Sequence, residues 1–137
     1  MTPVLLDTGC IVALLDRSEQ YHKVCTAAIA DLEAPLLTCE AVIAESCYLL
    51  RWLPGAGEAV LQNVDRGRFL VPYRLTGNAG SVGKLMKKYR DVPMDLADAY
   101  LVDMAGIYRT GRILTLDSDF GIYRWGKNRP FELLLTL

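Results

Sequence analysis

The sequence predicts an α/β fold in three layers, with a central, mostly parallel sheet of four or five strands and helices on both faces. Two observations lead to this class. Short apolar runs alternate with helical patterns along the whole chain, and this alternation is typical of a parallel sheet covered by helices. A carboxylate also follows two of the apolar runs, at Asp7 and Asp117. In open α/β sheets ligands bind just beyond the carboxyl ends of the strands, so these two side chains become candidates for chemistry.

Five apolar runs are the predicted strands. They cover residues 4–6, 36–37, 69–73, 112–116 and 131–135. Runs of this kind are typical of parallel strands that are buried on both faces. Within the third run, Pro72 favours the end of the strand because proline cannot donate to a ladder.

Between these runs, apolar residues recur at helical spacing. They predict helices over residues 11–15, 21–32, 39–52, 58–66, 76–90 and 92–109. Asp7 and Thr8 precede the first of these helices, and side chains of both types accept from free N–H groups at a helix start. Capping is therefore an alternative explanation for Asp7.

Length and composition place the chain among ordinary globular proteins. Its 137 residues, 52% of them apolar, are expected to form a single domain over residues 1–137 with a sizeable core. A formal net charge of −1 gives no overall cationic field, so a nucleic acid would have to be held by local patches or by metal. No uncharged apolar stretch approaches about 18 residues and no signal-peptide pattern is visible, so we expect a cytoplasmic protein without a membrane span.

We assign no catalytic role to the cysteines or to the single histidine. The four cysteines lack CxxC spacing and three of them have apolar surroundings, which favours reduced core thiols over a zinc site or disulfides. They are Cys10, Cys25, Cys39 and Cys47. His22 is the only histidine, and we expect it to be a surface or capping group.

Five carboxylates are predicted to meet at one edge of the sheet. Asp7, Asp117 and Asp119 follow strands, whereas Glu45 and Asp98 belong to helices that begin at the same edge. At an effective dielectric constant near 20, each close pair of such charges would repel by roughly 4 kcal/mol. A cation would relieve this repulsion, and oxygen ligands without His or Cys favour Mg²⁺ or Mn²⁺ over zinc.

A site of this composition suits hydrolysis of phosphodiesters. A divalent ion can generate a nucleophilic hydroxide and stabilise the leaving oxygen. The chain offers no Ser-His-Asp or Cys-His set and no phosphate-binding GxxxxGK[ST] loop. Thr8, Thr115 and Ser118 are candidates to orient a carboxylate or a metal-bound water.

The acids of the last predicted helix have a structural explanation as well. Asp95 is a good N-cap, and Asp98 is an N3 acid that favours the positive end of the helix. Asp103 lies about 140° away around the helix, so we expect it on another face.

The densest basic cluster lies on the helix predicted over residues 76–90. Lys84, Lys87 and Lys88 stand opposite its apolar side. Such a run usually forms a solvated face, and the alternative is an RNA-binding patch.

Four motifs in this order resemble the PIN-domain family, and most of all the small VapC-type ribonuclease toxins of bacteria and archaea. They are Leu-Leu-Asp-Thr-Gly, Ala-Glu-Ser, Leu-Ala-Asp-Ala and Leu-Thr-Leu-Asp-Ser-Asp-Phe. The resemblance covers nearly the whole chain and implies a PIN-like fold. It implies an acidic metal site of Asp7, Glu45, Asp98 and Asp117, with Asp119 as a fifth acid and Thr115 as the supporting hydroxyl.

The same resemblance implies a function and partners. These are metal-dependent endonucleolytic cleavage of single-stranded or loop RNA, a homodimer, and inhibition by a cognate antitoxin whose tail fills the acidic cleft. One departure from the family pattern is Gly9, where many members carry a serine, so a hydroxyl is missing beside the predicted site.

Several alternatives remain at this point. Haloacid-dehalogenase-type phosphatases need a second acid two residues after the first, and this chain has Gly9 at that position. Receiver-like domains need an Asp at the end of a middle strand, and the third predicted strand ends without one. Both families are therefore disfavoured. A PIN fold could also serve as a catalytically silent binding or assembly module. Finally, a PIN nuclease could act without an antitoxin in RNA processing or defence.

Overall fold

The computed structural model describes residues 1–135 and 137 and contains a five-stranded sheet in the order β3-β2-β1-β4-β7. Its strands are β1 (Val4–Leu6), β2 (Leu36–Leu37), β3 (Phe69–Leu70), β4 (Arg112–Leu114) and β7 (Glu132–Leu133). Every neighbouring pair is parallel. The predicted parallel sheet is therefore confirmed.

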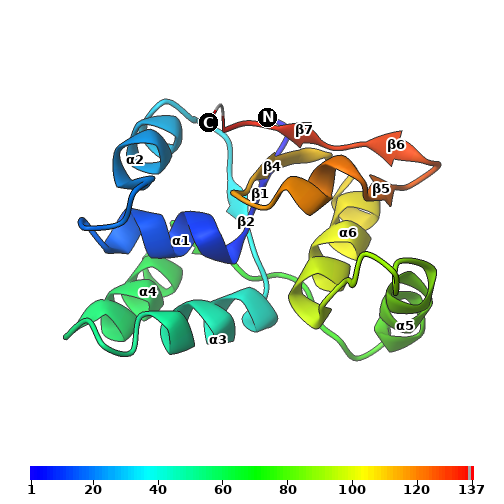
Figure 1. The fold of residues 1–137 in the computed structure, drawn as a ribbon, viewed down its shortest axis with the longest axis horizontal. Helices are drawn as coiled ribbons and strands as arrows, with labels where there is room; N and C mark the ends of the chain where they lie inside the picture. Colours follow the sequence, from blue (N-terminus) through cyan, green and yellow to red (C-terminus); the bar gives the residue numbers. More distant parts are fainter. Residues whose placement is uncertain (136) are drawn as a thin grey trace.

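Six helices surround this sheet. They are α1 (Thr8–Leu15), α2 (His22–Ala30), α3 (Glu40–Leu49), α4 (Ala56–Asp65), α5 (Ala79–Lys88) and α6 (Leu96–Tyr108). In Figure 1, α1 to α4 lie on one side of the strands, and α5 and α6 lie on the other. This confirms the predicted arrangement in three layers. Among the described residues, no helix has both the length and the apolar character needed to cross a membrane.

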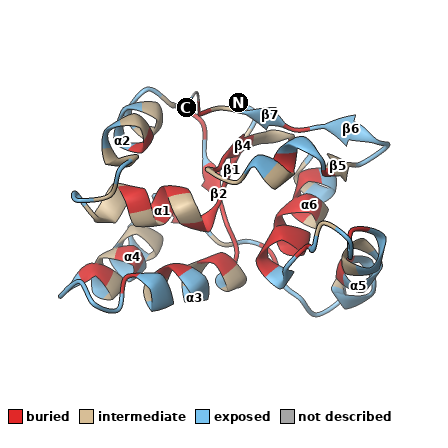
Figure 2. Ribbon diagram, in the orientation of Figure 1, coloured by how far each residue is buried: buried red, intermediate tan, exposed pale blue. Residues whose placement is uncertain are grey.

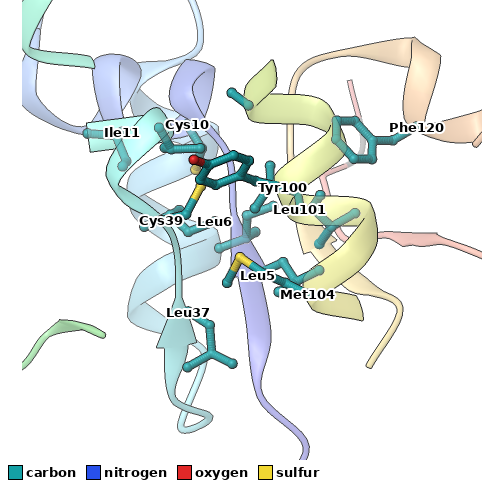
Figure 3. Close-up of a cluster of buried hydrophobic side chains, with 14 of the residues drawn as sticks. Leu5, Leu6, Cys10, Ile11, Leu37, Cys39, Tyr100, Leu101, Met104 and Phe120 are labelled. Atoms are coloured by element: carbon teal, nitrogen blue, oxygen red, sulfur yellow. The ribbon is translucent and has the colours of Figure 1, made fainter. Parts of the chain in front are cut away.

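The core forms where β1 meets the helices. Leu5 and Leu6 are fully buried, and Figure 3 shows them beside Leu101 and Met104 of α6. Figure 2 shows the same pattern over the whole chain, with buried residues concentrated on β1, β2, α1 and α6. β1 and β2 are buried along their whole length, which explains why these runs are continuously apolar, whereas both residues of the edge strand β7 are exposed.

The cysteines are free thiols, as expected. Cys10, Cys25 and Cys39 are buried and Cys47 is partly buried, with no disulfide among the described residues. They therefore act as small apolar side chains in the core. The half-buried His22 lies with Nδ1 2.7 Å from the carbonyl oxygen of Ala13 and so links α2 to α1.

Several elements differ in extent from the prediction. The third strand ends at Leu70 rather than at residue 73, the fourth ends at Leu114, and α3 ends at Leu49 rather than at residue 52. Near the third strand, Pro72 lacks the N–H that would continue the ladder. After β4 the chain turns, because the Thr115 hydroxyl accepts from the backbone N–H of Asp117 at 3.0 Å.

The sequence did not predict the short elements near the C-terminus. These are the 3₁₀ helix η1 (Ser118–Gly121) and an antiparallel hairpin of β5 (Arg124–Trp125) and β6 (Arg129–Pro130). The hairpin strands are too short and too polar to show a periodic pattern. Its turn is made by Gly126 and Asn128, which have φ angles of 55° and 59°.

The order of the strands determines where a site can form. The chain proceeds from β1 to β2 and β3 in one direction, and it then returns to add β4 and β7 on the other side of β1. A crevice opens beyond the carboxyl ends of the two strands at such a switch point. Asp7 directly follows β1, and Asp117 lies three residues after the end of β4, so both belong to this crevice.

Candidate active site

Asp7 is held from both sides of the switch point. It is the N-cap of α1, and only 7% of the residue is exposed. Its Oδ1 accepts from the backbone N–H of Thr8 at 2.8 Å, and its Oδ2 accepts from the hydroxyl of Thr115 at 2.7 Å. Capping and a place in the crevice are therefore compatible properties of the same carboxylate.

Asp98 is held equally firmly at the start of α6. Asp95 is the N-cap and accepts from the backbone N–H of Asp98 at 2.8 Å, as the sequence predicted. Oδ2 of Asp98 accepts from the hydroxyl of Tyr123 at 3.0 Å. Tyr123 is itself fully buried and packs edge-on against Tyr89 and Phe120. The sequence offered no signal for Tyr123, because its contact with Asp98 exists only in the tertiary structure.

Asp117 and Asp119 share one turn of η1. Asp117 is the N-cap, and its Oδ1 accepts from the backbone N–H of Asp119 at 2.9 Å. Asp119 thus orients Asp117 through its backbone, while its own side chain is not among those that line the acidic cavity. Ser118, another candidate, is exposed and does not line the cavity either.

The acids from separate segments open onto one cavity of about 320 Å³, which we call the acidic cavity. It is lined by Asp7, Thr8, Gly9, Glu45, Leu49, Asp95, Asp98, Leu116 and Asp117. All four principal acids predicted from the sequence are in this set. Asp95 is a fifth carboxylate, which the sequence indicated only as a helix cap.

Burial and crowding shift the pKa values of the two inner acids. Burial is the main reason that the pKa of Asp7 is raised to about 6, and the charges of Asp117 and Glu45 add to it against the hydrogen bonds from Thr115 and Thr8. Burial likewise raises the pKa of Asp98 to about 7, with further contributions from the charges of Asp95, Asp7 and Asp117. Burial and the neighbouring carboxylates therefore disfavour the ionised form of both acids in the cavity.

The side chains suit a divalent cation in their chemistry. Every donor at the cavity is a hard oxygen, which is the ligand type that Mg²⁺ and Mn²⁺ take. Thr8 Oγ1 is buried and has no hydrogen-bond partner within the described residues. In the part of the chain that the structure describes, however, no three His, Cys, Asp or Glu side chains stand close enough together to hold an ion. To coordinate one ion, the carboxylates would have to move closer together. The metal site therefore stays a prediction.

Other residues singled out from the sequence lie elsewhere. Asp103 accepts from the hydroxyl of Tyr73 at 2.6 Å and is absent from the lining of the acidic cavity, in keeping with its expected place on another face. Lys84, Lys87 and Lys88 are all exposed on α5. Lys84 and Lys88 line a second hollow, whereas Lys87 does not.

Three comparisons with known proteins agree with this architecture. The family model described as PIN domain matches residues 4–125. Ribonuclease VapC26 of Mycobacterium tuberculosis is 30% identical over 116 residues, which make up 83% of this chain and 86% of that protein. The crystal structure of VapC20 from Mycobacterium tuberculosis, described as a Sarcin-Ricin loop cleaving toxin, matches with a TM-score of 0.81 and 16% identity. That match covers 93% of this chain and 99% of the other.

Proposed function

The chain belongs to the PIN-domain family, and on that premise we propose that it is a metal-dependent endoribonuclease that cleaves single-stranded or loop RNA. The observation that carries the proposal is the acidic cavity at the switch point of the sheet, which is lined by five carboxylates from four segments of the chain. The relative that is 30% identical is named a ribonuclease, which supports RNA as the substrate.

In this proposal Asp7, Glu45, Asp98 and Asp117 hold Mg²⁺ or Mn²⁺. The bound ion would supply an activated water and stabilise the leaving oxygen of the scissile phosphodiester. Asp95 lines the same cavity and adds a fifth carboxylate. Because the inner acids have raised pKa values, their deprotonation and the binding of the cation are coupled.

Three neighbouring groups keep the inner carboxylates in place. The Thr115 hydroxyl donates to Asp7, and the Tyr123 hydroxyl donates to Asp98. The backbone N–H of Asp119 donates to Asp117. Such supporting hydrogen bonds limit the rotation of the carboxylates and so reduce the cost of ordering them around a substrate or an ion.

We further propose that the protein is the toxin of a toxin–antitoxin pair, that it forms a homodimer, and that it acts in the cytoplasm, where its RNA substrate would be. Similarity to VapC26 and VapC20 supports the first point. Tyr48 and Leu49 at the end of α3 and Trp52 just beyond it are more than half exposed, and Trp52 is 82% exposed. Leu49 also lines the acidic cavity. Apolar surface of this kind suits a protein partner that reaches the carboxylates.

Cleavage of a labelled panel of single-stranded and hairpin RNAs by purified protein tests the activity. Mg²⁺, Mn²⁺ and EDTA are compared, and so are Asp98→Asn and the matched control Asp65→Asn, an exposed acid on α4. We expect cleavage that requires metal, disappears in Asp98→Asn and persists in Asp65→Asn. Cleavage in EDTA, or an active Asp98→Asn protein, would contradict the proposal.

The alternatives give different outcomes in the same experiment. A catalytically silent binding module would leave every RNA intact while retaining its partner. A PIN nuclease of RNA processing would cleave RNA in the same metal-dependent way, but its expression would not arrest growth. Arrest by the wild type and normal growth with Asp98→Asn would favour the toxin.

A further inference from the structure

A second hollow lies beside α6, between α5 and the β5–β6 hairpin. It measures about 310 Å³, and its lining includes Lys84, Lys88, Asp103, Arg124 and Trp125. We call it the basic groove. Figure 1 shows α5 and the hairpin on the side of the molecule away from α2 and α4.

The positive charge of the basic groove is largely uncompensated. Three cationic side chains line it against the single carboxylate of Asp103, which also accepts from the hydroxyl of Tyr73. Over residues 1–135 and 137 the one ion pair within 4.0 Å joins Arg112 to Glu132. Lys84, Lys88 and Arg124 therefore have no salt-bridge partner there, although the whole chain carries a net charge of −1.

The wall formed by the hairpin is held by hydrogen bonds and close packing. Nη1 of Arg124 donates to the carbonyl oxygens of Gly121 and Tyr123 at 3.0 and 2.9 Å. Nε1 of Trp125 donates to the carbonyl oxygen of Pro130 at 3.1 Å. A Cβ at Gly111 would lie 2.2 Å from the same nitrogen, so only glycine allows the indole to approach this closely. The cation and the aromatic ring are thus positioned before any ligand arrives.

Two segments of the chain extend from the acidic cavity to the basic groove. On α6, Asp98 lines the cavity and Val102 lines the groove, four residues or about 6 Å farther along the helix. Directly before the hairpin, the Tyr123 hydroxyl donates to Asp98, while the next two residues, Arg124 and Trp125 of β5, line the groove. A ligand in the groove would therefore lie close to the carboxylates.

From these observations we propose that the basic groove binds the phosphodiester backbone of an RNA strand whose neighbouring segment enters the acidic cavity. This inference rests on the proposed ribonuclease function and assigns its substrate-binding residues. Phosphates would pair with Lys84, Lys88 and Arg124, since cations held in a groove attract a strand independently of its sequence. Lys87, which does not line the groove, has no part in it.

Fluorescence anisotropy of a labelled single-stranded RNA in EDTA measures binding without cleavage. The test variant is Lys84→Gln/Lys88→Gln. The matched control is Lys23→Gln/Arg66→Gln, which removes two exposed cations from α2 and from the C-cap of α4. Melting temperatures establish that both proteins are folded.

We expect the test variant to lose at least about tenfold in affinity at low salt, and the control to bind like the wild type. Because two phosphate contacts are removed, the slope of log K against log salt should become shallower by about 1.4 in the test variant. Equal affinity and slope in the test variant and the wild type would overturn the proposed role of the groove in RNA binding. Cleavage by the wild type would then still support the proposed function. Equal losses in test and control would also overturn it, as an unspecific charge effect. A wild-type protein that neither binds nor cleaves RNA would overturn both proposals.

Discussion

The acidic cavity and the basic groove flank the same helix but are built in opposite ways. In the cavity, Asp7 and Asp98 are each only 7% exposed, receive hydrogen bonds from neighbouring side chains and have raised pKa values. In the groove, Lys84 and Lys88 are exposed to solvent. Charges interact strongly when buried and weakly when screened by water and salt. Changes in the cavity should therefore have large effects on chemistry and stability, and single changes in the groove should have small effects on binding.

The largest effect is expected for Asp117→Asn. Asparagine retains the side-chain oxygen that caps η1 through the N–H of Asp119, so the fold should be preserved. If Asp117 holds the metal as proposed, this change removes a charged ligand and should lower metal-dependent RNA cleavage by at least about a hundredfold, because even changes in supporting residues cost 10- to 100-fold. Single-turnover cleavage measures this loss. Full activity of the variant would show that Asp117 is not required for cleavage.

Next in size is the effect of pH on stability in EDTA. The pKa of Asp7 in the folded protein, about 6, is above the ordinary value of 3.8. Protonation therefore favours the folded state, so the stabilisation is present below about pH 4 and is lost as the pH rises toward 6. The change corresponds to about 3 kcal/mol in the free energy of unfolding. Asp98, whose pKa is about 7, extends the decline to that pH.

Asp7→Asn should remove the part of this pH dependence that Asp7 contributes. An amide can accept from the N–H of Thr8 and donate to the Thr115 hydroxyl, so the neutral side chain fits the same contacts. At pH 7 in EDTA the variant should melt at a higher temperature than the wild type. Mg²⁺ should raise the melting temperature of the wild type only. Lower stability of Asp7→Asn at pH 7 would contradict the destabilising effect assigned to the buried Asp7 charge.

A smaller loss is expected for Tyr123→Phe. The variant keeps the packing against Phe120 but removes the hydroxyl that donates to Asp98. Mn²⁺ affinity, measured by calorimetry, and the cleavage rate should each fall about tenfold. Tyr108→Phe at the end of α6 is the matched control. If both variants behave alike, Tyr123 serves packing alone.

The smallest effect is expected for Lys87→Gln. This lysine is exposed and does not line the basic groove, so RNA affinity at 0.1 M salt should change by less than about twofold. Lys88→Gln should weaken binding more and make the salt slope shallower by about 0.7. A stronger effect of Lys87 than of Lys88 would show that RNA follows a different face of α5.

Much of the site could be predicted because its residues belong to local patterns. Asp7 follows an apolar strand and caps a helix, and Asp98 follows an N-cap by three residues. The order of the motifs suggested that Glu45 and Asp117 accompany them, and all four line one cavity. The sequence also predicted the basic cluster that contains Lys84 and Lys88. It could not show that these two lysines line the groove and Lys87 does not, because all three lie close together on one helix.

By itself the sequence determined the alternating strands and helices, the parallel sheet and the edge at which the acids collect, since apolar periodicity and helix capping act over a few residues. Only the tertiary structure decided that Tyr123 supports Asp98, that Asp95 reaches the acidic cavity, and that a polar hairpin closes the basic groove. These contacts join residues far apart in the chain. They depend on how the layers pack, which no local pattern encodes.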